Sequence, residues 1–363
     1  MGGFMLDNDN DELISDINIK VIGVGGGGGN ALNCMVTAGI KDVEYIAVNT
    51  DAAALRSSKA TQKVQIGEKL TRGRGAGNKP DVGERSAQEN KDEISAALKG
   101  ANMVFIAAGM GGGTGTGAAP VVAEIAQEMD ILTVAVVTKP FNFEQKAKMI
   151  QAEKGIEELK KHVDSLIVIP NEKLLVGSEK PLTMKESFSM ADDILKTGVK
   201  SIAELITVEG MINLDFADVE TTMKNAGYAH MAIGHGSGKD KAQEAANAVI
   251  TSPLLETSIS GATRLLVNIV MSEDILASDV DMATKLISDA ADPNVDMIFG
   301  TSFDESMQDE MNITVIAAGF NNLEEDVPEE PAAAEPAPAQ QPAQKQTNDF
   351  NDYSDLFKIF NER

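Results

Sequence analysis

The chain has 363 residues, of which 43% are hydrophobic, so it is long enough for two domains with a sizeable core in each. Its 31 Lys and Arg residues against 56 Asp and Glu residues give a formal net charge of −25, which repels nucleic-acid backbones and anionic lipid headgroups. A single cysteine, Cys34, excludes an intramolecular disulfide and a zinc site built on cysteines, and it favours a reducing cytoplasm.

The first residues differ in composition from the rest of the chain. Residues 1–16 lack the basic start and the apolar run of a signal peptide, and we expect them to form a flexible N-terminal extension. No stretch of the sequence approaches the roughly 20 consecutive apolar residues that a membrane span needs. These features predict a protein that is neither secreted nor inserted directly into a membrane.

The first half of the chain alternates short apolar runs with helical patterns. The runs are rich in β-branched residues and end in polar residues, glycine or proline, as buried parallel strands do; they cover residues 17–24, 43–50, 103–110, 131–140 and 165–170. The helical patterns between them cover residues 31–37, 83–98, 118–129 and 144–162. This order predicts an α/β domain over residues 17–182 with a doubly wound parallel sheet, whose ligands bind at the carboxyl ends of the strands.

A long helical pattern follows over residues 183–207, and we expect it to connect two domains. The second, over residues 208–320, is predicted to be a smaller α/β domain. Its strand candidates are residues 228–236, 264–271, 295–302 and 311–319, and its helix candidates lie near residues 239–250 and 279–290.

The last part of the chain divides into two segments by composition. Residues 321–348 combine acids with Pro, Ala and Gln, which predicts a disordered linker because such a segment buries too little apolar surface to offset chain ordering. Residues 349–363 concentrate aromatic and aliphatic side chains, as a short docking peptide does. The alternative is a frayed end with a few accidental apolar residues: Phe350, Tyr353, Leu356, Phe357, Ile359 and Phe360.

A glycine-rich turn lies directly after the first predicted strand and before a helix. Gly23, Gly25 and Gly28 match the G-x-G-x-x-G pattern, in which glycine lets the backbone approach a phosphate closely and the helix start attracts the anion. By itself the pattern leaves open an NAD-binding Rossmann enzyme. Asn49 and Asp51, near the end of the second strand, stand about where such an enzyme has its ribose-binding acid.

A second glycine-rich turn, residues 109–117, also lies between a strand and a helix. Two such turns in one sheet predict two sets of backbone donors that converge on one polyphosphate, with the Thr114 and Thr116 hydroxyls as further donors. A nicotinamide enzyme has no need of the second turn. A P-loop NTPase is excluded because the pattern G-x-x-x-x-G-K-[ST] does not occur, and the basic stretch 72–80 is expected to form a loop beside the nucleotide.

The sequence GGGTGTG at residues 111–117 resembles the signature loop of the tubulin superfamily. Together with KVIGVGGGGGN at 20–30, TKPFNFE at 138–144 and NLDFADV at 213–219, it closely resembles FtsZ, the family of bacterial tubulin-like cell-division GTPases, over residues 17–320. The resemblance implies a cytoplasmic GTPase that self-assembles into head-to-tail filaments and forms the division ring at midcell. A GTP-binding scaffold without turnover is the alternative within this superfamily.

The resemblance also implies roles for individual residues. The ribose would be held by Glu144, and Lys148 stands where the family usually has arginine, which keeps the charge but loses the planar fork. The guanine would be contacted by Asn171, Phe188 and Asp193. Mg²⁺ would be held mainly by the β- and γ-phosphates, without direct protein ligands. The phosphates would lie against Gly26, Gly27, Gly28, Gly29, Asn30, Gly113, Thr114 and Gly115.

The resemblance places the catalytic side chains in the loop after the long helix. Asp215 and Asp218 would polarise the attacking water and Asn213 would help to orient it. A helix of about 25 residues is on the order of 35 to 40 Å long, so these acids cannot reach the nucleotide of their own subunit. Polymerisation would instead bring the loop into the pocket of the next subunit. The alternative is a purely structural turn in which Asp218 caps a helix over residues 219–226.

The final segment departs from the family pattern. Family members usually carry an Ile-Pro-x-Phe-Leu core in their docking peptide, whereas residues 355–360 read DLFKIF and contain no proline. We expect residues 349–363 to bind membrane-tethering and regulatory division proteins, but the sequence leaves the identity of these partners open.

Overall fold

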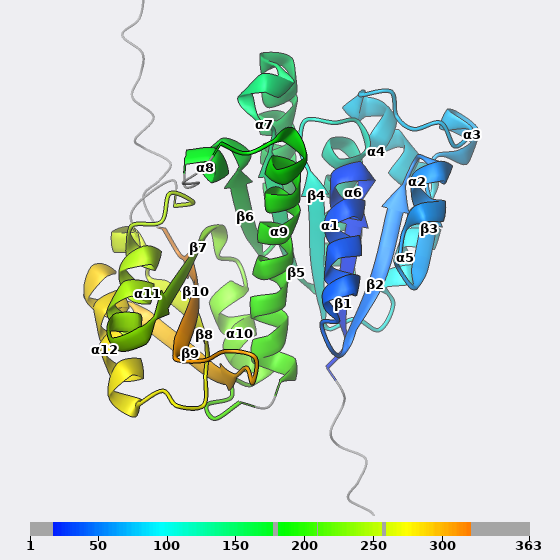
Figure 1. Cartoon of the computed structure of the whole chain (residues 1–363). Helices are drawn as coiled ribbons and strands as arrows, with labels where there is room; N and C mark the ends of the chain where they lie inside the picture. The colour runs from blue at the N-terminus through cyan, green and yellow to red at the C-terminus, as the bar shows by residue number, and fades with distance from the viewer. Residues whose placement is uncertain (1–16, 177–180, 209, 256–258, 321–363) are drawn as a thin grey trace, which may run out of the picture. The chain divides into compact units, whose positions relative to one another are not determined.

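The computed structural model describes residues 17–176, 181–208, 210–255 and 259–320 (Figure 1). The predictions for residues 1–16, 321–348 and 349–363 lie outside the described residues. The strands are β1 (Ile19–Val24), β2 (Val43–Asn49), β3 (Gln62–Gln65), β4 (Met103–Gly109), β5 (Leu132–Lys139), β6 (Ser165–Pro170), β7 (Gly227–Ser237), β8 (Arg264–Met271), β9 (Asp296–Phe303) and β10 (Glu310–Ala318).

The helices include every one that the sequence patterns indicated, with changed ends, and several short ones that they did not. They are α1 (Gly25–Ala38), α2 (Ala52–Ser57), α3 (Glu68–Thr71), α4 (Pro80–Glu89), α5 (Lys91–Leu98), α6 (Thr114–Glu128), α7 (Lys146–Lys160), α8 (Asn171–Val176), α9 (Met184–Thr207), α10 (Phe216–Met223), α11 (Lys241–Ile250) and α12 (Ala277–Ala290), with 3-10 turns at Asn142–Glu144, Gly238–Asp240 and Ile259–Gly261.

The strands form one ten-stranded sheet in the order β3-β2-β1-β4-β5-β6-β7-β10-β8-β9. The first six strands are all parallel; the sequence predicted five of them, and β3 was missed. Strand β7 pairs in parallel with β6 over three residue pairs and antiparallel with β10, so it carries the sheet from the first region into the second. The two regions that the sequence analysis separated therefore share a continuous sheet.

Two hydrophobic clusters cover the two faces of the parallel strands. Alternate residues of β1 point to opposite faces: Val21 packs with Leu32 of α1 and Leu195 of α9, whereas Ile22 packs with residues of α5, α6 and α7, such as Ile94 and Val122. Figure 1 shows α1 and α9 on the near face of the sheet and α6 behind it. This is the doubly wound arrangement that continuous apolar strands predict.

A third cluster holds the second region together. Helices α11 and α12 pack beside each other on the sheet, and Val249 and Ile287 meet Val267 of β8 and Ile313 of β10. The observed strands and helices agree with the predicted α/β pattern there. Among the described residues, no helix has the length and apolarity that crossing a membrane would require.

Three local predictions need correction. The helix predicted over residues 83–98 is two helices, because the Asn90 side chain accepts a hydrogen bond from the Gly67 N–H at 2.8 Å and donates to Glu93 at 3.2 Å, and the backbone leaves the helical region at Asn90. The helices predicted from residues 31 and 118 begin earlier, at Gly25 and Thr114, so much of each glycine run belongs to the first turns of a helix.

Candidate functional site

Two helix N-termini meet at the carboxyl ends of adjacent parallel strands. Helix α1 follows β1, helix α6 follows β4, and Val24 pairs with Ala108 at the end of these strands. Neither helix has a side-chain cap or an acidic residue in its first turn. Their first N–H groups are thus unclaimed by caps, and both positive dipole ends favour an anion.

The glycines permit the close approach of these elements. A Cβ on Gly28 would lie 2.1 Å from the carbonyl oxygen of Ala107, and one on Gly27 would lie 3.1 Å from the Cα of Gly109. Any larger residue at position 28 would push α1 away from β4. Gly26 and Gly27 are exposed, so the outer backbone of this first turn is open to a ligand.

A cavity of about 280 Å³ opens beside these turns. Six of the residues predicted to bind GTP line it: Gly27, Asn30, Glu144, Lys148, Asn171 and Phe188. Gly26, Gly29 and Asn30 also line a smaller adjoining hollow, of about 100 Å³, that reaches the end of β2. Gly28, Gly113, Thr114 and Gly115 belong to the same two turns but do not line either space.

The two threonines of the second turn form internal hydrogen bonds. The Thr114 hydroxyl lies 2.7 Å from the Thr50 hydroxyl, and this contact joins the start of α6 to the residue that follows β2. Thr116 is buried, and its hydroxyl oxygen accepts a hydrogen bond from the Gly111 N–H at 2.8 Å. Thr114 and Thr116 line neither of the two cavities described above, and Thr116 lines a different groove. The expected role of the two hydroxyls as donors to the polyphosphate therefore has no support from these cavities.

The loop at residues 72–80 packs against the second turn. A Cβ on Gly113 would lie 2.8 Å from the backbone nitrogen of Lys79 and from the side chain of Ala76. The basic loop therefore contacts the residue that precedes α6. The expectation that this loop lies beside the nucleotide stays a prediction.

Glu144 is held in a defined orientation at the cavity wall. One carboxylate oxygen accepts a hydrogen bond from the Phe141 N–H at 3.1 Å, and the other forms an ion pair with the Lys148 ammonium at 3.0 Å. The Glu144 side chain is 18% exposed, against 38% for that of Lys148. The lysine that replaces the usual arginine thus contacts the predicted ribose-binding carboxylate directly.

Asn171 and Phe188 form the far part of the cavity. Asn171 is buried, and its amide oxygen has no hydrogen-bond partner within the described part of the chain. Such an unsatisfied buried acceptor in a cavity wall is suited to a ligand that donates a hydrogen bond. The half-exposed ring of Phe188 lines the cavity and is nearly perpendicular to the rings of Phe141 and Phe143, with ring centroids 5.2 and 6.2 Å away.

The carboxylate beside this aromatic ring belongs to Asp192, which the sequence analysis did not select. Asp192 follows Phe188 by one helical turn and lines the cavity, because residues i and i+4 share a helix face. Burial and the neighbouring charge of Asp193 raise the pKa of Asp192 to about 6. Asp193, the predicted residue, is not part of the cavity lining; its half-exposed carboxylate pairs with Lys196 at 2.7 Å.

The predicted catalytic residues lie at the other end of α9. This helix has 24 residues and is therefore about 36 Å long, with Phe188 in its second turn and the loop to α10 after its last residue. Figure 1 shows α10 beside the end of α9 that is distant from α8. Asn213 and Asp215 are exposed, and the fold does not bring them to the cavity of the same chain.

The alternative capping role falls on a different residue from the one expected. Helix α10 runs over Phe216–Met223, and its cap is Asp215, whose carboxylate accepts a hydrogen bond from the Asp218 N–H at 2.9 Å. The prediction that Asp218 caps a helix over residues 219–226 is wrong. The Asn213 side-chain oxygen accepts a hydrogen bond from the Gly210 N–H at 2.5 Å, which turns the loop back on itself.

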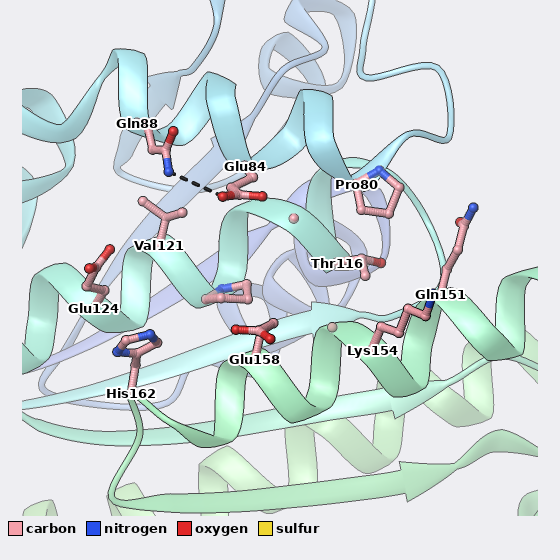
Figure 2. A pocket seen from close by; sticks show the side chains of 13 residues that line it. Pro80, Glu84, Gln88, Thr116, Val121, Glu124, Gln151, Lys154, Glu158 and His162 are labelled. Carbon is pink, nitrogen blue, oxygen red and sulfur yellow. Dashed lines mark hydrogen bonds between the residues drawn. The ribbon is translucent and has the colours of Figure 1, made fainter.

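A separate and larger groove, of about 550 Å³, lies between α4, α6 and α7 (Figure 2). Glu84, Glu124 and Glu158 stand along it, one on each of these helices. These carboxylates disfavour a phosphate group, and the residues that line the groove do not include the exposed first turn of α1. The groove is therefore poorly suited to a polyphosphate.

The doubly wound sheet, the paired glycine turns and the long helix between cavity and acidic loop define a GTPase of the tubulin class. Residues 18–177 match the GTPase domain of the Tubulin/FtsZ family, and residues 227–321 match the C-terminal domain of the FtsZ family. The chain belongs to the FtsZ family, and it is accordingly a cytoskeletal cell-division GTPase.

Solved structures agree with this assignment. FtsZ from M. jannaschii, solved as an empty dimer, is 43% identical and superposes with a TM-score of 0.80, covering 84% of this chain and 89% of that chain. CetZ2 from Haloferax volcanii, solved as a GTPγS-bound protofilament, is 23% identical with a TM-score of 0.71, covering 84% and 94% of the two chains. The CetZ2 likeness shows the shared fold. The alternative of an NAD-binding Rossmann enzyme is wrong.

Proposed function

We propose that the cavity between α1, α7 and α9 binds GTP and GDP, and that the loop before α10 completes the hydrolytic site of the next subunit in a head-to-tail filament. The observation that carries the proposal is the separation of the two halves: the uncapped helix N-termini and the acidic loop lie at opposite ends of α9. The helix starts offer donors for the phosphates, and the loop offers carboxylates for the attacking water. A single subunit does not bring the two together, so its site is incomplete.

The phosphates would lie along the first turns of α1 and α6. Backbone N–H groups of Gly26 to Asn30 and of Gly113 to Gly115 would donate to the phosphate oxygens, as the uncapped helix starts favour. Glu144, already oriented by Phe141 and Lys148, would accept from the ribose hydroxyls. Lys148 would keep this carboxylate in place at the cavity wall.

The guanine would stack on Phe188 and meet the Asn171 amide and a carboxylate. For that carboxylate we propose Asp192 in place of Asp193, because Asp192 lines the cavity and Asp193 pairs with Lys196. A carboxylate accepts hydrogen bonds from the two adjacent donors on the guanine edge, and such charge-assisted bonds contribute more than neutral ones. The unsatisfied oxygen of Asn171 would accept a further bond from the base.

Hydrolysis would use the loop residues Asn213, Asp215 and Asp218 of the neighbouring subunit. The carboxylates would polarise the attacking water, and Asn213 would orient it. Mg²⁺ would be held mainly by the phosphates, where it offsets the charge that develops on them. Within the described residues, no group of three or more His, Cys, Asp and Glu side chains is arranged to hold a metal ion.

Self-assembly follows from a shared site, since a head-to-tail contact that does not close produces filaments. The relatives described above include a dimer and a protofilament. We further propose that such filaments form the division ring at midcell in the cytoplasm. Residues 349–363 would bind membrane-tethering and regulatory division proteins, without nucleic-acid binding or direct insertion into the membrane.

Three measurements test the shared site. The GTPase rate per subunit should rise steeply with protein concentration. Asp215→Ala should lower that rate by roughly 10²- to 10⁴-fold while GTP binding persists. Electron microscopy of the unaltered protein should show filaments with GTP and not with GDP. A rate independent of concentration contradicts assembly-dependent hydrolysis. GTP binding without turnover in the unaltered protein would instead identify the alternative, a non-hydrolysing scaffold.

A mixing experiment separates action on a neighbour from action within one subunit. Asp215→Ala subunits bind GTP but lack the loop carboxylate, whereas Asn171→Ala/Phe188→Ala subunits keep the loop and lose guanine contacts. Each variant alone should be nearly inactive, and an equimolar mixture should regain turnover because intact loops meet occupied cavities. A mixture as inactive as its components would contradict hydrolysis across the subunit contact.

A further inference from the structure

The segment that leads into the catalytic loop is attached to strand β9 at one residue, Thr301. The Met211 N–H donates to the Thr301 carbonyl oxygen at 3.2 Å, and the Thr301 N–H donates to the Ile212 carbonyl oxygen at 3.1 Å. These bonds form an isolated antiparallel bridge between Ile212 and Thr301. The backbone immediately before Asn213 is therefore paired to the sheet.

The Thr301 side chain adds a third bond to the same segment. Its hydroxyl oxygen accepts a hydrogen bond from the Ile212 N–H at 3.2 Å, and Thr301 is only 4% exposed. The loop side chains themselves bury little, since Met211 is 72% and Ile212 is 41% exposed. Hydrogen bonds to Thr301, more than apolar packing, hold this part of the loop.

The surrounding backbone is packed closely enough to make this attachment specific. A Cβ on Gly210 would lie 1.9 Å from the Thr301 carbonyl oxygen, and one on Gly300 would lie 2.6 Å from a Leu205 methyl carbon of α9. Gly210 also donates its N–H to the Asn213 side chain. Thr301 is thus hydrogen-bonded to Ile212, the residue directly before Asn213, which is the first of the proposed catalytic residues.

Strand β9 is itself fixed relative to α9. Thr301 is opposite Ile269 of β8 in the sheet, and the adjacent Asn268 is buried and donates from its side chain to the Ser201 carbonyl oxygen of α9 at 3.2 Å. The attachment point of the loop therefore belongs to the rigid sheet and is not a mobile part of the surface.

We propose that Thr301 is a positioning residue for GTP hydrolysis: its hydroxyl and backbone set the geometry of Asn213 and Asp215 as they enter the neighbouring nucleotide site. The inference rests on the proposed function of that loop. Small displacements of groups that orient an attacking water reduce the rate strongly, whereas they leave nucleotide affinity alone when the nucleotide is bound by other residues. In a variant at position 301, the loss of the hydroxyl that accepts from the Ile212 N–H should reduce the rate of hydrolysis, whereas a change in side-chain shape should not.

Thr301→Val in the full-length protein tests this assignment, because valine keeps the branched shape and removes the acceptor for the Ile212 N–H. We expect kcat at saturating protein and GTP to fall by about tenfold or more. The affinity of the unassembled protein for GTP should stay within about twofold, since Thr301 lies far from the cavity. Thr301→Ser keeps the hydroxyl and should restore most of the rate.

A double variant separates positioning from general destabilisation. When Asp215→Ala has already removed the catalytic carboxylate, adding Thr301→Val should cause little further loss of rate, because both changes act through the same loop. A merely structural role predicts a further loss in the double variant and a lowered GTP affinity in the single one. If Thr301→Val does not fold, the comparison of Thr301→Ala with Thr301→Ser serves the same purpose.

The outcomes distinguish this inference from the function on which it rests. A folded Thr301→Val protein with an unchanged kcat, or a Thr301→Ser protein as slow as the valine variant, would overturn the positioning role alone. Hydrolysis that continues unchanged in Asp215→Ala would overturn the shared catalytic site, whatever the behaviour of Thr301.

Discussion

The carboxylate of Asp215 accepts a hydrogen bond from the backbone N–H of Asp218 at 2.9 Å, so a proposed catalytic acid is also the cap of α10. The two roles can be separated by substitution. Asp215→Ala removes both, and the lost cap is expected to cost about 0.5 to 2 kcal/mol of folding stability. Asp215→Ser keeps a capping oxygen and should recover most of that stability.

The first prediction is that the serine variant is nonetheless inactive. A missing general base lowers rates by roughly 10² to 10⁴-fold, and a serine hydroxyl cannot replace it. The measurements are the GTPase rate at saturating protein and the urea midpoint of the same two variants. Substantial activity in Asp215→Ser would show that the cap, and not the carboxylate, is what hydrolysis needs.

The second prediction concerns the neighbouring acids of α9. Asp192→Asn should weaken GTP binding by roughly 10- to 100-fold, because a hydrogen bond to a charged group contributes about 1.5 to 3 kcal/mol. Asp193→Asn is the matched control: it removes the same charge one residue away, from a side chain paired with Lys196, and affinity should change less than about twofold. The reverse pattern would restore Asp193 as the guanine-binding acid.

The third prediction is a pH dependence of nucleotide affinity. Burial and the charge of Asp193 raise the pKa of Asp192 to about 6 in the free protein, and guanine donors would favour its ionised form. GTP binding should therefore weaken as the pH falls through 6, by up to tenfold per unit, and change little above 7. The GTP phosphates titrate in the same range, so the quantity to plot is the ratio of wild-type to Asp192→Asn affinity.

The same shift acts on folding with the opposite sign. A carboxyl whose pKa is higher in the folded than in the unfolded state is destabilising when ionised, so this cost is present above pH 6 and is lost as the pH falls toward 4. Protonation of Asp192 at low pH should thus remove its unfavourable contribution to the free energy of folding, while it weakens nucleotide binding. An affinity ratio that is flat from pH 5 to pH 8 would contradict a role for Asp192 at the base.

The fourth prediction concerns the packing of α4 against α6. A Cβ on Gly117 would lie 1.9 Å from the Pro80 carbonyl oxygen, so Gly117→Ala forces these helices apart at the groove that both residues line. We expect a loss of about 1 to 3 kcal/mol, measured as a lower urea midpoint without nucleotide. Gly29→Ala is the control, since its Cβ would meet nothing within 4 Å and alanine favours the helix. Equal effects of both changes would contradict the packing argument.

Much of the fold could be predicted because its signals are local. Apolar runs such as the one that ends at Val24 must be buried on both faces, and glycines placed between strand and helix bring backbone N–H groups to a phosphate. The motif GGGTGTG at 111–117 then indicated the family, which the comparisons confirm. The early start of α1, inside its glycine run, was missed because glycine has low helix propensity and only packing on β4 overrides it.

The sequence by itself determined the class of nucleotide site, the parallel sheet and the helix that separates cavity from acidic loop, because periodicity and glycine spacing act within short stretches of chain. Only the tertiary structure decided which side chains face each other. It placed Asp192, and not Asp193, in the cavity wall, made Asp215 the helix cap, and brought Thr301 against Ile212, 89 residues away in sequence. Such choices depend on the rotation of a helix or the pairing of distant strands, which no local pattern specifies.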